Sequence, residues 1–178
     1  MKFSIVVVSA LFTLASALPN EAGTLEARAP QACGDPRRVV PFLRSFNSRV
    51  VDHFYTTNSA EARNARSSGY ASEGTAGYVF PSRQPGTVPF YRLYSSGATD
   101  HFYTTDASER DSAIRNGYRS EGTAGYIYPN NNCGGVPFYR LYSSSGTDHF
   151  YTTSASERDS ATGSGYRSEG IAGYIYPF

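Results

Sequence analysis

The chain has 178 residues and a formal net charge of +1, from 16 basic and 15 acidic side chains. No basic stripe stands out along it, which argues against a protein that binds nucleic acid electrostatically. Its fifteen Tyr and eleven Phe, with no Trp, indicate sheet surfaces that pack or receive ligands, because a Tyr ring is apolar while its hydroxyl prefers water.

Residues 1–17 have the pattern of a secretory signal peptide. Lys2 is followed by an apolar run at 5–14 and then by Ala-Ser-Ala, a small-x-small cleavage pattern. The run is too short to span a bilayer comfortably, so no membrane contact is expected after cleavage. Residues 18–39 are predicted to form a pro-segment or N-terminal tail. The sequence therefore predicts a secreted protein, extracellular or associated with a cell wall, whose folded domain is 40–178.

The chain has two cysteines, Cys33 and Cys133. In a secreted chain such a pair most simply forms one disulfide. The enclosed loop would add roughly 4 to 5 kcal/mol of stability in the chain-entropy model. A free nucleophilic thiol is the less favoured alternative, because neither cysteine has a partner histidine in a recognisable sequence context.

The strongest signal is an internal repeat of 48 residues. The three copies occupy residues 40–81, 88–129 and 136–177 and need no insertion or deletion to align. The second and third copies agree at 35 of 42 positions, and the first agrees with the second at 23.

Each copy predicts the same elements in the same order. VPFYRLY reads as a strand, and DHFYTT reads as a second strand after a Ser/Gly turn. A capping residue three positions before a Glu, as in Asp106 and Glu109, indicates a short helix that stops at a glycine such as Gly117. EGTAGYIYP then reads as a third strand, so each copy is expected to be ββαβ.

A ββαβ unit of this size would be marginally stable alone, so the three copies are expected to share one core. The predicted fold class is a β-rich α+β domain. The copies could form a closed pseudo-threefold arrangement, trefoil-like or propeller-like, or a short linear stack. A Cys33–Cys133 disulfide would favour the compact arrangement over an extended rod.

The repeated histidines, His53, His101 and His149, allow two interpretations. They could converge and bind zinc, or each could serve its own copy. The second is favoured and no metal is predicted, because the chain has no helical His pair and no Cys/His cluster.

The carboxylates give a similar choice. The helix cap explains one repeated set, Glu61, Glu109 and Glu157, whereas no local partner is evident for the other set, Glu73, Glu121 and Glu169. Glu121 and Asp100 could form a glycosidase pair, but a small domain seldom carries three equal active sites, whereas a binding module gains from them. No catalytic residue and no cofactor are therefore predicted.

Strand alternation sorts the remaining side chains by face. His101 and Tyr103 should share one face, and Asp100 and Phe102 the other. Packing is the first explanation for the tyrosines, and a sugar-binding surface of Tyr, Arg, Asp, His and Glu is the functional one. The candidate ligand-binding residues are Tyr91, Arg92, Asp100, His101, Tyr103, Glu121, Tyr139, Arg140, Asp148, His149, Tyr151 and Glu169.

The first copy departs from the other two. Leu43, Ser45, Phe46 and Ala71 stand where the second copy has Tyr91, Leu93, Tyr94 and Arg119. If each copy binds a ligand, the first is predicted to be the weakest.

The repeated string resembles a secreted repeat family of unknown function, found in fungal proteins and after the catalytic domain of some bacterial lysozymes and cell-wall hydrolases. The matching residues are Tyr91, Arg92, Leu93, Tyr94, Asp100, His101, Phe102, Tyr103, Thr104, Glu121, Gly122 and Ala124 to Tyr126, with their third-copy equivalents. The resemblance covers about residues 40 to 178. It implies a non-catalytic module associated with cell walls or glycans.

Together these observations predict a secreted, non-catalytic protein that binds carbohydrate, with a glycan or a cell-wall polysaccharide as its partner. The alternatives are a secreted protein-interaction module, such as an effector or inhibitor, and, less favoured, a cell-wall hydrolase.

Overall fold

The computed structural model describes residues 32–177. The predicted signal peptide and most of the predicted tail lie outside this range. The strands and α-helices occur in the same order in all three repeats, which we number 1 to 3 along the chain. A 3-10 helix, η1 Pro36–Arg38, precedes them, and only repeat 1 has a second one, η2. Their bounds are β1 Val40–Asn47, β2 Asp52–Thr56, α1 Ser59–Ala65, η2 Arg66–Ser68 and β3 Ala71–Val79; β4 Val88–Ser95, β5 Asp100–Thr104, α2 Ala107–Arg115 and β6 Arg119–Ile127; β7 Val136–Ser143, β8 Asp148–Thr152, α3 Ala155–Gly163 and β9 Arg167–Ile175.

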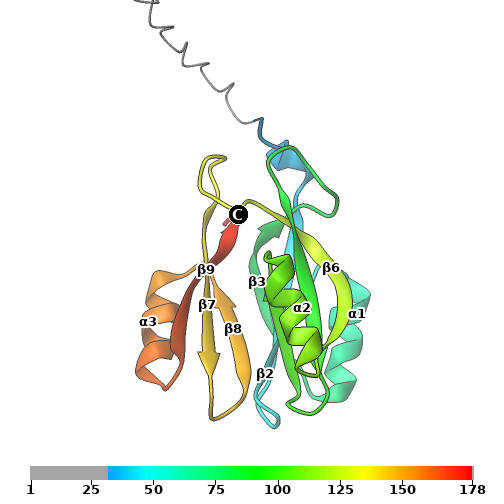
Figure 1. Ribbon diagram of the computed structural model, residues 1–178, viewed down its shortest axis with the longest axis vertical. Helices are drawn as coiled ribbons and strands as arrows, with labels where there is room; N and C mark the ends of the chain where they lie inside the picture. Colours follow the sequence, from blue (N-terminus) through cyan, green and yellow to red (C-terminus); the bar gives the residue numbers. More distant parts are fainter. Residues whose placement is uncertain (1–31, 178) are drawn as a thin grey trace, which may run out of the picture. The chain divides into compact units, whose positions relative to one another are not determined.

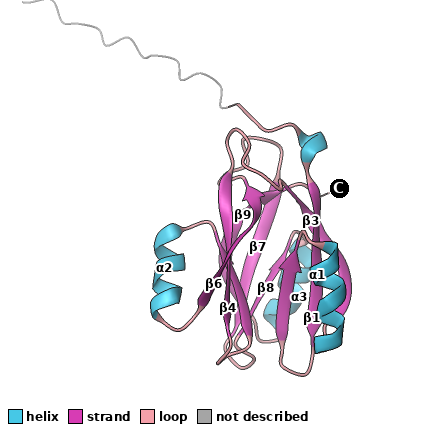
Figure 2. Cartoon of the chain, turned by 90° about the vertical axis from the view of Figure 1, so that its right-hand side faces the viewer, coloured by secondary structure: helices cyan, strands magenta, loops and turns pink. Residues whose placement is uncertain are grey.

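Each repeat forms its own three-stranded antiparallel sheet, with the first strand in the middle. The strand orders are β2-β1-β3, β5-β4-β6 and β8-β7-β9. The helices lie on the outside of the strands in both views (Figures 1 and 2). The predicted ββαβ unit is therefore confirmed.

The helix signals are also confirmed at both ends. The side chains of Asn58, Asp106 and Ser154 accept hydrogen bonds from first-turn amides, as N-caps do. After α2, Gly117 has φ of +97°, a left-handed conformation that glycine adopts without steric cost. The short helices have no buried residue of their own.

Burial in the strands differs from simple alternation at two places. All five residues of β2 are buried, so this strand is covered on both faces. In the middle strand of repeat 2, the register against β6 shifts between Phe90 and Leu93, and both side chains are buried. The extra residues at these shifts lie in β6, so the alternation of the middle strand itself is unchanged. Phe90 belongs to the main buried cluster and Leu93 does not, as expected for side chains on opposite faces of a strand that is covered on both.

The three repeats share one core, as predicted. Each contributes a Phe, a Tyr and a branched aliphatic side chain to a single buried cluster. Its members are Phe42, Tyr55, Val79, Phe90, Tyr103, Ile127, Phe138, Tyr151 and Ile175. A smaller aromatic cluster of Phe80, Tyr128 and Tyr176 lies next to Cys133.

Tyrosine hydroxyls connect the inner edges of the three sheets. The hydroxyl of Tyr103 accepts from the amide of Tyr55 at 2.8 Å and donates to the carbonyl of Tyr55 at 2.8 Å. Tyr151 does the same for Tyr103, and Tyr55 for Tyr151. Each hydroxyl therefore satisfies both backbone groups of an edge residue that has no strand partner on that side.

Repeat 3 contacts repeat 1 as well as repeat 2, which a linear stack would not allow. Isolated bridges join Tyr78 to Tyr176, Phe80 to Tyr126, and Tyr128 to Tyr174. The sheets nevertheless remain three separate three-stranded sheets and do not merge into one closed barrel.

The last residues of the predicted tail belong to the folded unit. Cys33 and Cys133 form the expected disulfide, with an S–S distance of 2.05 Å. Beside it, the amide of the buried Gly34 donates to the hydroxyl of Tyr128 at 3.0 Å. Residues 32–39 thus cover the smaller aromatic cluster rather than extending away from it. Among the described residues, no helix is long and apolar enough to cross a membrane.

Candidate functional site

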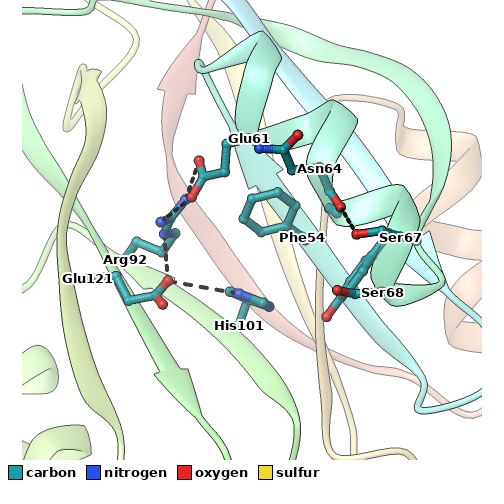
Figure 3. A pocket seen from close by; sticks show the side chains of 10 residues that line it. Phe54, Glu61, Asn64, Ser67, Ser68, Arg92, His101 and Glu121 are labelled. Atoms are coloured by element: carbon teal, nitrogen blue, oxygen red, sulfur yellow. Dashed lines mark hydrogen bonds and ion pairs between the residues drawn. The ribbon is translucent and has the colours of Figure 1, made fainter.

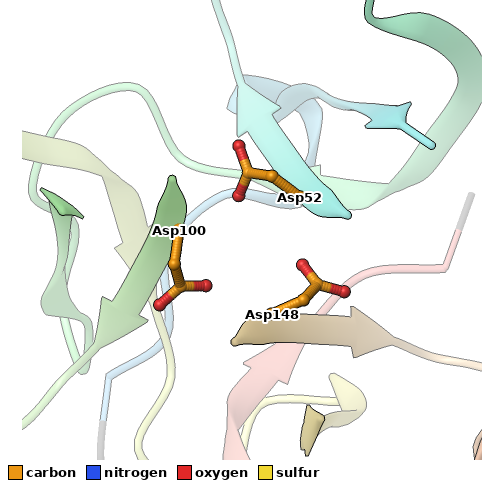
Figure 4. A group of neighbouring side chains, drawn as sticks. All are labelled: Asp52, Asp100 and Asp148. Atoms are coloured by element: carbon orange, nitrogen blue, oxygen red, sulfur yellow. The ribbon is translucent and has the colours of Figure 1, made fainter. Parts of the chain in front are cut away.

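Three carboxylates, one from each repeat, meet where the second strands begin (Figure 4). Asp52, Asp100 and Asp148 have no exposed surface, and each offers a carboxylate oxygen within 4.8 Å of the others. In the described part of the chain these acidic side chains converge, whereas the histidines stand one per repeat interface. The sequence hypothesis of a three-histidine centre therefore does not match the geometry.

Each aspartate clamps its own repeat to the next. Asp52 accepts from the amide of His101 at 2.8 Å with one oxygen and from Nδ1 of His101 at 2.6 Å with the other. The hydroxyl of Tyr70 donates to that second oxygen. Equivalent contacts join Asp100 and Asp148 to the histidines and tyrosines at the other two interfaces.

Because a carboxylate only accepts, Nδ1 of each histidine carries the hydrogen of this bond. Nε2 is therefore the ring nitrogen turned away from the clamp. In His101 it lies 3.9 Å from a carboxylate oxygen of Glu121, at the wall of a surface pocket.

This pocket, the 1–2 pocket, lies between repeats 1 and 2 (Figure 3). It has a volume of about 390 Å³. Repeat 1 contributes helix α1 and the region around it, and repeat 2 contributes three side chains from its strands. The lining residues are Phe54, Glu61, Asn64, Ala65, Ser67, Ser68, Tyr70, Arg92, His101 and Glu121.

One arginine holds two carboxylates in place across the 1–2 pocket. Arg92 donates from its two terminal nitrogens to Glu61 of the other repeat, at 3.1 and 2.8 Å. Its Nε lies 2.7 Å from Glu121, although without the alignment of a hydrogen bond. The guanidinium carbon stands 5.3 Å from the ring centre of Phe54, within the range of a cation–π contact. These charged groups are therefore fixed in orientation before any ligand arrives.

Pairing between Arg92 and Glu61 shifts the pKa values of both side chains. Burial alone would raise the pKa of Glu61, but hydrogen bonds from Arg92 and Thr56 outweigh burial and lower it. Burial alone would lower the pKa of Arg92, but the hydrogen bond to Glu61 and the nearby negative charges raise it. Both groups stay charged at neutral pH. Two Glu and one Arg give the pocket a net acceptor character.

The same pocket occurs at the other two interfaces. The 2–3 pocket has a volume of about 250 Å³ and the 3–1 pocket about 220 Å³. In the 3–1 pocket, Arg44 of repeat 1 donates to Glu157 of repeat 3 at 3.0 and 2.9 Å, and its Nε lies 2.9 Å from Glu73. In the 2–3 pocket, Arg140 takes the same place between Glu109 and Glu169.

The structure divides the predicted ligand-binding residues into three groups. The pocket group lines the three pockets or ties their carboxylates together: Arg92, His101, Glu121, Arg140, His149 and Glu169. The core group has no exposed surface: Asp100, Tyr103, Asp148 and Tyr151. The third group, Tyr91 and Tyr139, lies outside the pockets, where Arg110 and Arg158 of their own helices cover one ring face at 4.4 Å.

Sequence reasoning assigned Glu61, Glu109 and Glu157 to the helix cap alone, which is wrong for their side chains. Their amides do bond the N-cap residue, but the carboxylates turn away from it. That of Glu61 accepts from Thr56 at 2.5 Å and from Arg92. These Glu residues have the spacing of a capping box, but their carboxylates bind an Arg of the neighbouring repeat. The sequence pattern is the same for a capping Glu and for one that binds the neighbouring repeat.

Tyr70, Tyr118 and Tyr166 were also missed. They follow the helix-ending glycines at the 48-residue spacing, and this regularity was the available signal. Burial and the hydrogen bond to an aspartate raise the pKa of each of these hydroxyls well above its usual range.

The departures of the first copy lie outside the 3–1 pocket to which it contributes. Phe46 stacks on His53 with ring centres 4.3 Å apart, as Tyr94 packs on His101 at 4.6 Å. Arg44, His53 and Glu73 all line that pocket. The first copy thus keeps the polar groups of the other two.

The fold and the pockets define a β-rich module of three repeats, with one polar pocket at each repeat interface. The chain belongs to the family described as a domain of unknown function (DUF5648), whose profile matches residues 41–176. Neither the curated proteins nor the solved structures contain a significant match.

Proposed function

We propose that this protein is a non-catalytic carbohydrate-binding module that holds a glycan through its three interface pockets. The observation that carries the proposal is the fixed set of one Arg, two Glu and one His at every repeat interface. The Arg lines the 1–2 and 3–1 pockets, and at the 2–3 pocket Arg140 holds the two Glu that line it. Sugar hydroxyls both donate and accept, so they match a pocket that offers ionised acceptors beside guanidinium and imidazole donors.

Pocket size supports a small polar unit as the ligand. Ordinary small-molecule pockets begin at about 300 Å³, and two of the three pockets are smaller than this. Each therefore suits a single sugar ring of a longer chain, and one such site would bind weakly. We infer a pseudo-threefold arrangement, supported by the equivalent Asp–His clamp at each interface. Three weak sites on one rigid domain gain avidity for a polymer that presents the same unit repeatedly.

Secretion and association with a cell wall are part of the proposal. The Cys33–Cys133 disulfide supports an oxidising compartment, because disulfides rarely persist in the cytosol. The signal-peptide pattern and the resemblance of the repeats to those of cell-wall proteins add to this support.

The test combines a glycan array with pull-down on chitin, glucans, mannans and peptidoglycan. Asn64, Ser112 and Ser160 occupy the same helix position in the three repeats and line the three pockets. Changing all three to Leu should obstruct the pockets while leaving every Arg–Glu pair intact. We expect polymer binding to be lost, and a single change such as Ser112→Leu to weaken it in part.

A matched control places Leu at Ser59, Ala107 and Ala155, which are exposed on the same helices and do not line the pockets. These variants should bind as the wild type does. Equal loss of binding in both sets, or no binding of the wild type to any glycan, would count against the proposal and favour a protein partner.

A further inference from the structure

Repeat 1 carries a second hollow that is rich in arginine. This feature, the Arg49–Arg66 groove, has a volume of about 430 Å³. One wall is the end of β1 with the turn that follows it, and the other is η2 with Gly69. Its lining residues are Asn47, Ser48, Arg49, Val50, Arg66, Ser67, Ser68 and Gly69.

Asn47 joins the two walls of the groove by a hydrogen bond and also braces the turn that forms one of them. The side-chain amide of Asn47 donates to the carbonyl of Ser68 at 2.9 Å and accepts from the amide of Arg49 at 3.1 Å. Asn47 is itself buried, at 6 % exposure. The groove is therefore formed before any ligand arrives.

Within residues 32–177, no carboxylate pairs with the two arginines of the groove. Arg49 and Arg66 are exposed, and neither forms an ion pair with a carboxylate of residues 32–177, in contrast to Arg44 and Arg92. The carbonyl groups at the helix end carry a partial negative charge of about half a unit. Two full positive charges outweigh it, so the groove favours an anion.

The other repeats lack these charges. At the positions of Arg49 and Arg66, repeat 2 has Gly97 and Ile114, and repeat 3 has Ser145 and Thr162. The repeated scaffold therefore does not require arginine at either position. The pair is a property of repeat 1 alone.

The groove adjoins the 1–2 pocket. Ser67 and Ser68 line both hollows, so a ligand seated in the pocket can reach the groove along these two residues. The groove offers guanidinium donors where the pocket offers mainly carboxylate acceptors. A ligand that satisfies both must carry hydroxyl groups at one end and an anionic group at the other.

We propose that the Arg49–Arg66 groove binds the carboxylate or sulfate of an acidic glycan whose neighbouring sugar occupies the 1–2 pocket. This inference rests on the proposed function and names the ligand class for one of its three sites. Arginine suits both groups because its planar fork can donate two parallel hydrogen bonds to their oxygens.

The first experiment compares matched oligosaccharides by titration calorimetry: an oligogalacturonate with its methyl ester, and a sulfated oligosaccharide with its desulfated form. We expect the wild type to bind at least one acidic form about tenfold more tightly, which corresponds to about 1.4 kcal/mol. Arg49→Ser with Arg66→Thr, the residues of repeat 3, should remove this preference and keep binding of the neutral form. Arg63→Ser with Arg83→Ser removes the same charge from outside the groove and should keep the preference.

Equal affinity of the wild type for both members of each pair would overturn the inference while the proposed function stands. So would a preference that survives in the groove variant, or one lost equally in the control. The second experiment does not depend on a glycan: inorganic sulfate is titrated into the labelled protein, and amide shifts are followed by NMR. Saturable shifts at Arg49 and Ser68 that vanish in the groove variant support an anion site even if no glycan binds, and their absence refutes it.

Discussion

At the scale of single residues, this protein uses tyrosine as a hydrogen-bonding cross-link. Tyr55, Tyr103 and Tyr151 have no exposed surface, yet each hydroxyl is satisfied by the backbone of a neighbouring repeat. A buried donor or acceptor without a partner costs about 1 to 3 kcal/mol. These hydroxyls therefore serve stability, although their residue type alone also suggested a ligand surface.

Removing one of these hydroxyls should be costly. Tyr103→Phe leaves the ring in the core but strips the amide and carbonyl of Tyr55 of their partner. We expect the free energy of unfolding to fall by about 2 to 4 kcal/mol, as measured by urea denaturation. Tyr91→Phe, which removes a hydroxyl outside the core, should change it by less than about 0.5 kcal/mol. Similar effects of the two changes would contradict the role assigned to Tyr103.

At the scale of elements, the third strands of neighbouring repeats pack so closely that one strand position leaves no room for a side chain. A Cβ atom on Gly173 of β9 would lie 2.5 Å from Cδ1 of Ile127 and 3.0 Å from the carbonyl oxygen of Tyr128. Both atoms belong to repeat 2. The glycine in AGY therefore marks contact between repeats rather than a turn, a role its place in a strand permits.

Two glycines of repeat 3 should respond in opposite ways to the same substitution. Gly173→Ala forces β9 away from β6 and should destabilise the protein by about 1 to 3 kcal/mol. Gly163→Ala, at the end of α3, meets no atom within 4 Å and should stabilise by up to about 1 kcal/mol through helix propensity. Thermal unfolding of both variants checks this pair, and a stabilising Gly173→Ala would show that the third strands can separate freely.

At the scale of the whole molecule, the same side chains join each repeat to both of the others. Six tyrosines lie at these joints, and burial is the first cause that raises their pKa values above the usual range. These are Tyr55, Tyr70, Tyr103, Tyr118, Tyr151 and Tyr166. A tyrosine whose pKa is raised by folding contributes stability that is complete below the unfolded value, about 10, and is lost as pH rises above it.

The protein should therefore unfold cooperatively in alkali. As pH rises above about 10, only the unfolded chain releases these six protons, so the unfolding free energy falls steeply. Tyrosinate absorbance and circular dichroism, followed together, should show that these tyrosines ionise as the structure is lost. Ionisation of all fifteen tyrosines in a chain that keeps its circular dichroism would contradict this account.

The elements were predictable because they depend on local chemistry. Alternating β-formers gave the strands, and Asp106 and Gly117 marked the helix ends. The site was predictable only in part. Arg92, His101 and Glu121 were among the predicted ligand-binding residues, and Glu121 stood out because it repeats without a local partner. Glu61 was missed because the helix cap supplied a local explanation. The amide of Glu61 bonds the N-cap of its own helix, while its carboxylate bonds Arg92 of the next repeat.

The sequence by itself determined the repeat, its ββαβ order and the family. Caps, turns and strand patterns depend on residues that are close together in the chain, and the repeat shows as the recurrence of these patterns. Only the tertiary structure decided that the aspartates meet at the centre and that the Arg, Glu and His side chains assemble into pockets between repeats. Each pocket joins residues about 30 to 110 positions apart, as in Arg92 with Glu61 and Arg44 with Glu157. Residues this far apart in sequence meet only because the shared core brings the edge strands of the three repeats together. No local sequence pattern specifies which repeat packs against which.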